Sequence, residues 1–288
     1  MGDLLVPETI VLEIARFSPE SGQPPRFDTF EVPNRPDWMV LDALNYIKDQ
    51  IDGSLTFRWS CRMGICGSCG MMINGREWLA CERRISDCGS IGPIQVAPLK
   101  NFPIIRDLVI DMTDFLEKLE KTRPWLIRDK DTLPQQEFLQ TPAQLDRYKQ
   151  YSMCINCMLC FSACPIYGID PTFAGPATIA LAQRWNMDSR DHGETIRTDI
   201  LSQHDGIWDC VVIGECSVVC PKNVDPSLSI QEYKLTATKE WFKSFLLPRS
   251  KAYWHCGSAS TMETVLGRKM AGIPCTGPAR LPPAVTTR

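Results

Sequence analysis

Several features of common protein classes are missing from this sequence of 288 residues. It has no apolar run that approaches the roughly 18 residues of a membrane-spanning helix, so we expect no span of its own. It has no GxGxxG phosphate-binding loop, and no grouping of His, Asp or Ser side chains indicates a substrate site. A formal net charge of −3 argues against nucleic acid as a partner. The histidines are scattered singly, so we treat none as a metal ligand: His192, His204 and His255.

The first residues also lack targeting and lipidation signals. Asp3 and Glu8 leave no basic lead, so we expect no secretory signal peptide. Gly2 suggests N-myristoylation, but Val6 occupies the position where that motif requires Ser or Thr. Any membrane attachment is therefore expected to go through partner subunits.

Cysteine, in contrast, is abundant. The chain has 14 cysteines, which is not the pattern of a small secreted disulfide scaffold in a protein of this length. Most of them fall into metal-ligand spacings, and this indicates a reducing compartment in which thiols stay free. Three match no motif, and we assign no role to Cys88, Cys256 or Cys275.

The second half of the chain contains two related cysteine runs. Residues 154–164 read CINCMLCFSAC before Pro165, which is C-x2-C-x2-C-x3-C-P. Residues 210–220 repeat the spacing with Ile213 in the second cysteine position. In bacterial ferredoxins the first three thiolates of such a run bind one cluster and the fourth binds its neighbour. Crossed runs predict a 4Fe–4S site of Cys154, Cys157, Cys160 and Cys220, and a three-thiolate site suited to 3Fe–4S of Cys164, Cys210 and Cys216.

A third cysteine group lies in the first half. Cys61, Cys66, Cys69 and the more distant Cys81 have the C-x4-C-x2-C…C spacing of plant-type 2Fe–2S sites. Glycines between these ligands let the backbone pass close to a cluster and aim its N–H groups at sulfur. The dipeptide at 74–75, Asn-Gly, predicts a hairpin that returns Cys81 to the site. Structural zinc is the alternative interpretation of all three groups, and unpaired core cysteines are a further alternative for this third group.

The pattern around these cysteines predicts an α+β protein. Residues 8–17 and 27–32 are expected to be strands, and 55–57 a further short strand. Between them a helix is expected, starting near Asp37 or Asp42. It is marked by an apolar stripe at Val40, Leu44, Ile47 and Ile51.

The rest of the chain reads as mostly helical. Residues 98–134 look like a connection, with helical spacing from Ile105 to Leu119. Thr141-Pro142 predicts the start of a short helix that runs to about Tyr148. Further helices are expected over 177–187, 194–201 and 225–247. The resulting division is a β-grasp, plant-type ferredoxin domain (1–110), a helical, bacterial-ferredoxin-like domain (111–248) and a loosely ordered extension (249–288).

This combination resembles the iron–sulfur subunit of the succinate dehydrogenase/fumarate reductase family. The stretches FRWSCRMGICGSCG, CINCMLCFSACP, DSRDHG and CSVVCPKNVDP carry the resemblance, which covers roughly residues 8–248. It implies a flavoprotein partner that carries FAD and handles succinate and fumarate, and membrane anchor subunits that hold a quinone. It also implies a peripheral location on the cytoplasmic face of the inner (plasma) membrane. In this family the 2Fe–2S cluster faces the flavoprotein and the 3Fe–4S cluster lies beside the quinone.

Details of the resemblance favour the menaquinone-linked fumarate reductase branch. Ubiquinone-linked dehydrogenases have a Trp after the first Cys-Pro and a His after the first cysteine of the second run, where this chain has Ile166 and Val211. Lys234 falls where a lysine contacts the quinone in the menaquinol-linked enzymes, one turn after Gln231. Without the resemblance, Lys234 would be read as a solvated position on a helix.

The helix after Cys220 carries two apolar stripes, which predicts burial in a core or against another subunit. They are Leu228, Leu235 and Phe242, and Ile230, Tyr233, Ala237 and Trp241. Ile213 is expected to leave one cluster corner without a thiolate and to exclude the water that would replace it. Two other functions stay open: an electron relay for another quinone-linked flavoprotein, such as a glycolate oxidase or heterodisulfide-reductase-like complex, and a zinc-stabilised assembly module.

Overall fold

The computed structural model describes residues 8–89, 92–128 and 137–246. The predictions for the extension 249–288, with Cys256 and Cys275, lie outside these residues. The boundary expected near residue 110 falls between the last described strand and the helix that follows it.

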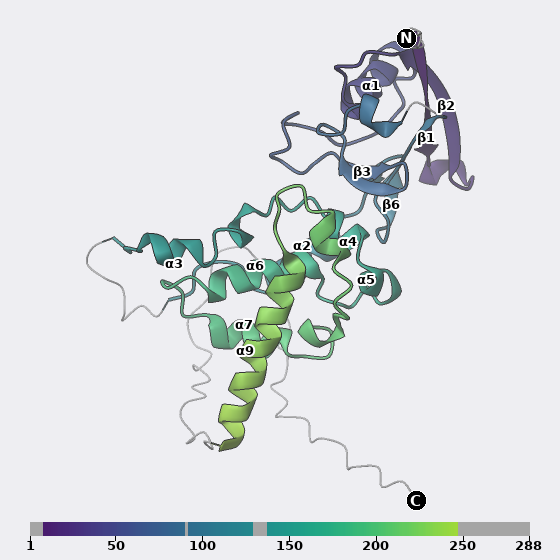
Figure 1. Ribbon diagram of the computed structural model, residues 1–288. Helices are drawn as coiled ribbons and strands as arrows, with labels where there is room; N and C mark the ends of the chain where they lie inside the picture. The colour runs from purple at the N-terminus through teal and green to yellow at the C-terminus, as the bar shows by residue number, and fades with distance from the viewer. Residues whose placement is uncertain (1–7, 90–91, 129–136, 247–288) are drawn as a thin grey trace, which may run out of the picture. The chain divides into compact units, whose positions relative to one another are not determined.

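A mixed five-stranded sheet forms the N-terminal part (Figure 1). Its strands are β1 (Thr9–Arg16), β2 (Arg26–Pro33), β3 (Gly70–Ile73), β4 (Arg76–Leu79) and β5 (Ile94–Ala97), in the order β2-β1-β5-β3-β4. β1 runs antiparallel to β2 and parallel to β5, while β3 is antiparallel to both β4 and β5. The two N-terminal strands predicted from the sequence are confirmed, and the sheet together with the helices below confirms the α+β class.

The predicted helix beside the sheet is α1 (Val40–Tyr46), which continues as a π-helical turn over Ile47–Ile51. Asp42 supports its start, because its carboxylate accepts a hydrogen bond from the Met39 N–H (3.0 Å). The predicted stripe is correct for the first three positions, which are fully buried, but Ile51 is 49% exposed. The wider π turn rotates the positions that follow, so the stripe ends there. The buried positions are Val40, Leu44 and Ile47.

One predicted strand and half of a predicted helix are wrong, and the Asp107 carboxylate accounts for both. Residues 55–57 form no strand. The helical spacing expected from Ile105 to Leu119 is confirmed only in its second half, as α2 (Thr113–Lys121), while its first half forms two short strands, β6 (Ile104–Arg106) and β7 (Val109–Ile110). Between these strands Asp107 has a φ of 46° and is buried. Its carboxylate accepts hydrogen bonds from the Thr56 N–H (2.9 Å), the Phe17 N–H (3.0 Å) and Arg16 Nε (3.1 Å). One buried turn residue therefore holds three distant segments in non-helical conformations.

The second part of the chain is helical (Figure 1). Its helices are α2 (Thr113–Lys121), α3 (Pro142–Asp146), α4 (Leu159–Ser162), α5 (Pro165–Ile169), α6 (Pro176–Asn186), α7 (Glu194–Leu201), α8 (Glu215–Val218) and α9 (Pro226–Leu246). The three long helices predicted after residue 170 are confirmed. Thr141 caps α3 as expected, since its hydroxyl accepts from the Gln144 N–H (3.3 Å), although the helix ends before Tyr148. α6 packs along α9.

A buried ion pair joins the connecting segment to this helical part. Arg197 on α7 and Asp191 before it are almost completely buried, with two N–O contacts of 2.7 and 2.9 Å. Arg197 also donates to the carbonyl oxygens of Arg123 (2.9 Å) and Trp125 (2.7 Å). Asp191 accepts from the Ile127 N–H (2.8 Å). Because both charges have several partners, the pair fixes the path of residues 123–127 over the helices.

Candidate iron–sulfur sites

The loop before β3 and the turn after β4 bring the first four cysteines together. Cys69 and Cys81 are buried, and Cys61 and Cys66 are half-buried. The hairpin predicted at Asn74-Gly75 joins β3 to β4, and both residues have positive φ, as a type I′ turn requires. At the base of the hairpin the Ala80 N–H donates to the Cys69 carbonyl (3.0 Å), which places Cys81 beside Cys69.

Backbone N–H groups surround the sulfur atoms of this loop. Cys61 Sγ accepts from the N–H groups of Ile65 (3.3 Å), Cys66 (3.3 Å) and Met63 (3.5 Å). Gly64, with a φ of 65°, donates its N–H to Cys81 Sγ (3.3 Å). Such donors stabilise negative charge on sulfur and are one of the means by which a protein tunes a cluster. Gly64 therefore directs its N–H group at a ligand sulfur, as expected for the glycines between these cysteines.

The ionisation of the thiols follows the same arrangement. Hydrogen bonds from the Met63, Cys66 and Ile65 N–H groups lower the pKa of Cys61 to about 6. Burial raises the pKa of Cys69 to about 12. A buried thiolate such as that of Cys69 therefore needs a positive partner, which iron provides when it binds.

The two cysteine runs of the helical part line two separate cavities. One is lined by the four thiols predicted for the 4Fe–4S site, and the other by the three predicted for the 3Fe–4S site together with Ile213. Each cavity takes thiols from both runs, as the crossed motif requires. The first set is Cys154, Cys157, Cys160 and Cys220, and the second is Cys164, Cys210 and Cys216.

The backbone of the second run repeats that of the first with an offset of 56 residues. Asn156 and Met158 have left-handed backbones (φ 53° and 62°), and so do Val212 and Gly214 (φ 63° and 85°). In each run a four-residue helix, α4 or α8, follows the second of these residues. A positive φ is unfavourable for a β-branched residue such as Val212, so the cluster loop imposes this conformation. Ile213 therefore occupies the position that Cys157 has in the first run.

Burial also governs the thiols of the helical part. It raises the pKa of Cys157 and of Cys216 to about 12, and that of Cys160 well above the ordinary range. Neighbouring thiols of the same cavity raise these pKa values further. Loading with iron must therefore displace protons from these thiols.

The thiols are not arranged as around a single metal ion. Within the described residues, no three His, Cys, Asp or Glu side chains converge in a way that would hold one ion. In an iron–sulfur cluster the thiolates are divided among two or more irons and need not all converge on one point, so cavities lined by thiols with N–H groups nearby fit clusters. Cys88 lies apart from all three sites: its thiol is half-buried and donates to the Arg84 carbonyl (3.3 Å).

The two residues expected at the quinone lie on α9 next to the third thiol set. Lys234 Nζ donates to the Cys210 carbonyl (2.7 Å), so its ammonium group touches the backbone of a predicted cluster ligand. The sequence did not reveal this contact. Gln231 lies one turn earlier, and its Nε2 is buried without a hydrogen-bond partner. A buried amide donor without a partner destabilises the fold, and a bound acceptor that hydrogen-bonds to it would remove this cost.

Exposed apolar side chains lie beside two of the sites, and no local sequence pattern predicts their exposure. Met63 (69%) and Ile65 (58%) are exposed in the first loop. Val211 (58%), Val212 (51%) and Ile213 (57%) are exposed in the third. Ile213 is itself open to solvent in this chain, and its expected exclusion of water from the cluster corner stays a prediction.

The two apolar stripes predicted on α9 differ in burial. Most of the second stripe is in the core, with Ile230, Tyr233 and Ala237 buried. The first stripe is exposed, and Trp241 is exposed with it. In the part of the chain that the structure describes, no helix has the length and apolarity needed to cross a membrane. The exposed positions are Leu228, Leu235, Trp241 and Phe242.

Comparison with known proteins matches both halves of the chain. Residues 11–117 match the family model of the 2Fe-2S iron-sulfur cluster binding domain, and residues 150–224 match that of the 4Fe-4S dicluster domain. A fumarate reductase iron-sulfur subunit of Mycobacterium tuberculosis is 55% identical over 84% of this chain and 98% of its own length. The corresponding subunit of Haemophilus influenzae is 46% identical, over 83% of this chain and 96% of its own length.

Succinate dehydrogenase subunits are less similar, at 36–38% identity. Among solved structures, a chain of the Mycobacterium smegmatis Sdh1 complex in the apo form matches with a TM-score of 0.73 and 26% identity. This match covers 81% of this chain and 97% of that one. The geometry of the thiols, the two domain matches and relatives matched over nearly their whole length agree. The chain belongs to the family of iron–sulfur subunits of fumarate reductases and succinate dehydrogenases.

Proposed function

We propose that this subunit carries electrons between a FAD-containing flavoprotein and a membrane quinone, with fumarate reduction as the physiological direction. The proposed ligands are Cys61, Cys66, Cys69 and Cys81 for 2Fe–2S, Cys154, Cys157, Cys160 and Cys220 for 4Fe–4S, and Cys164, Cys210 and Cys216 for 3Fe–4S. The observation that carries the proposal is the pair of cavities in which thiols of both runs meet. The higher identity to fumarate reductase subunits supports the direction.

Bound iron–sulfur clusters supply one-electron carriers, and the protein's part is to hold, tune and shield them. Backbone N–H groups at the first site stabilise charge on sulfur. Burial of Cys160 and Cys157 keeps water from the second site. At the third site Ile213 supplies no ligand, so that site has three thiolates instead of four, and a cluster of this different type is expected to have a higher potential.

At the third site we propose that Lys234 and Gln231 bind the quinone, since both lie on α9 and Lys234 contacts the Cys210 loop. The Lys234 ammonium is a charged donor, which favours negative charge on a carbonyl oxygen. Gln231 would find in that oxygen the acceptor that its buried amide lacks. The quinone we propose is menaquinone.

The exposed apolar faces suggest where the partners dock. Met63 and Ile65, beside the first site, are proposed to contact the flavoprotein. Val211 to Ile213 and the exposed stripe of α9 are proposed to contact the membrane anchors. This arrangement would hold the subunit peripherally on the cytoplasmic face of the inner membrane.

Metal analysis of anaerobically purified protein tests the proposal. We expect about nine irons per chain with matching acid-labile sulfide, following the three cluster types. Zinc in place of iron would instead establish the assembly-module alternative. Copurified flavoprotein that oxidises succinate supports the family function, whereas activity only with another substrate would favour a relay for a different flavoprotein.

A further inference from the structure

The loops of the first and second thiol sets touch each other directly. A Cβ on Gly67 would lie 2.7 Å from the Ile155 carbonyl oxygen and 3.0 Å from Cys157 Cα. A Cβ on Gly70 would lie 3.0 Å from the Cys157 carbonyl oxygen. Because these glycines have no side chain, the backbones of the two ligand loops meet without a layer of side chains between them. A single residue at their edge can therefore lie close to both sites.

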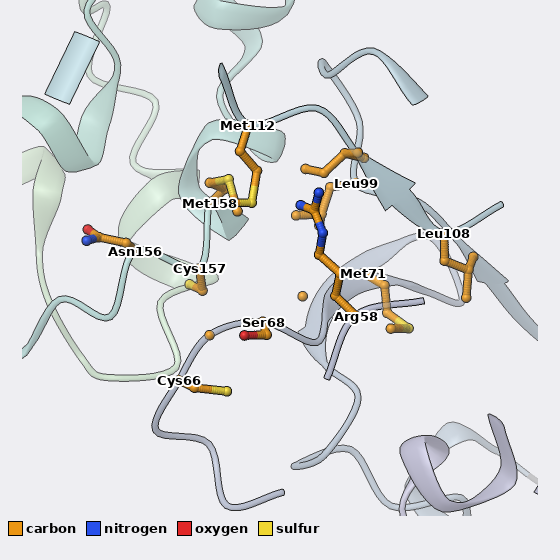
Figure 2. Close-up of a pocket in the computed structure, with 13 residues that line it drawn as sticks. Arg58, Cys66, Ser68, Met71, Leu99, Leu108, Met112, Asn156, Cys157 and Met158 are labelled. Carbon is orange, nitrogen blue, oxygen red and sulfur yellow. The ribbon is translucent and has the colours of Figure 1, made fainter. Parts of the chain in front are cut away.

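Arg58 occupies this position. It lines a cavity of about 150 Å³ whose walls include Cys66 and Ser68 from the first loop and Cys157 and Met158 from the second. Figure 2 shows the Arg58 side chain running along this cavity, with its guanidinium group between Met158 and Leu99. The residue is half-buried, so its charge is only partly screened by water.

The charge of Arg58 is not used by a nearby carboxylate. Among the residues that the structure describes, no carboxylate lies within 4.0 Å of its guanidinium, the distance that defines an ion pair. Hydrogen bonds from the hydroxyl and N–H of Thr113 lower the pKa of Asp111, and the charge of Arg58 lowers it further. The Asp111 carboxylate is therefore already engaged by Thr113. A partly buried cation without a partner costs free energy unless another anion lies close by.

The two clusters are such anions. Four thiolates outweigh the positive charge of an iron–sulfide core, and reduction adds a further negative charge. We propose that Arg58 is the shared counter-charge of the 2Fe–2S and 4Fe–4S clusters and raises the reduction potential of both. The inference rests on the ligand sets of the proposed function. Electron transfer between the two clusters moves one electron, with no bond formed or broken and no proton transferred. Because reduction adds a negative charge, a positive charge beside both clusters stabilises the reduced form of each.

The test compares Arg58→Gln and Arg58→Lys with the wild type in the full chain, purified without oxygen. Arg76→Gln is the matched control, because Arg76 is exposed at the hairpin and lies over the Trp78 ring at 6.0 Å, away from the cavity. The readout is a redox titration followed by electron paramagnetic resonance of the reduced 2Fe–2S and 4Fe–4S clusters. We expect Arg58→Gln to lower both midpoint potentials, Arg58→Lys to restore most of the loss, and the control to change neither.

Iron and sulfide content separates the possible failures. A wild type without iron would overturn the proposed function itself. A full iron content with either midpoint unmoved in Arg58→Gln would overturn only the role of Arg58. Should Arg58→Gln fail to hold iron, Met112→Lys adds a cation to the same cavity. That variant is expected to raise both midpoints, and unchanged midpoints would equally refute the proposal.

Discussion

Replacing Ile213 by cysteine should convert the third site into a complete four-thiolate site. The repeated backbone places Ile213 where Cys157 stands in the first run, between two residues of left-handed conformation in both cases. Ile213 also lines the cavity that Cys210 and Cys216 share. A thiol at this position starts from a backbone that already holds an equivalent thiol in the other run. Ile213→Cys is therefore expected to bind a fourth iron.

The size of the change follows from the surroundings of Ile213. One more thiolate retains one more iron per chain, and we expect the change of cluster type and ligation to lower the potential of the cluster. Because the Ile213 side chain is 57% exposed, its loss removes little buried apolar area. We expect the free energy of unfolding to change by no more than about 0.5 kcal/mol, as for other surface substitutions. Any slower electron exchange with quinone is then a redox effect, not misfolding.

The assay is electron paramagnetic resonance of the oxidised protein, together with iron analysis. The wild type should show the near-isotropic signal of an oxidised 3Fe–4S cluster. Ile213→Cys should lose that signal and gain one from a reduced 4Fe–4S cluster. Val211→Cys is the matched control: it is equally exposed in the same loop but lies outside the ligand position, and it should keep the wild-type signal. A freshly isolated wild type without the signal, or a variant that retains it, refutes the reasoning.

Three further predictions concern other residues. Lys234→Leu should reduce quinol-coupled turnover and spare succinate oxidation with a dye acceptor, whereas Lys149→Leu, exposed and outside α9, should affect neither; equal loss in both assays would point to misfolding. Arg197→Met should lower the free energy of unfolding by about 3–5 kcal/mol in urea titrations, because it leaves a buried carboxylate unpaired, and a change like that of an exposed ion pair would contradict this. Burial raises the pKa of Tyr233 to about 12. Tyrosine ionises near pH 10 when unfolded, so Tyr233 favours the folded state below about pH 10, and circular dichroism should show this contribution disappearing as the pH rises toward 12. The same decline in Tyr233→Phe would assign it to another group.

The cysteine positions could be predicted from the sequence because ligand spacing is a local property. Two residues separate Cys154 from Cys157, and this spacing fixes where the thiols point once the loop has wrapped around a cluster. The crossing of the two runs is a motif property of the same kind, and the structure places their thiols around shared cavities. Long periodic helices such as α9 were predicted for a similar reason.

The features that could not be predicted depend on contacts between distant residues. The turn at Asp107 exists because its carboxylate binds the backbone of Phe17 and Thr56, and no pattern near residue 107 shows this. The contact of Lys234 with the Cys210 carbonyl joins residues 24 positions apart. Exposure of an apolar side chain such as Met63 likewise depends on what the rest of the chain leaves uncovered.

The crossing of the runs also bears on the order in which the protein can mature. A nascent chain that ends before Cys210 has three thiols of one proposed site and a single thiol of the other, so neither cavity is closed. On these ligand sets, cluster insertion into the helical part would wait until ribosomal synthesis has passed Cys216 for the third site and Cys220 for the second. The first site has no such delay, because all of its thiols lie between Cys61 and Cys81. Maturation would thus proceed in two stages, with the N-terminal cluster able to form while the rest of the chain is still being made.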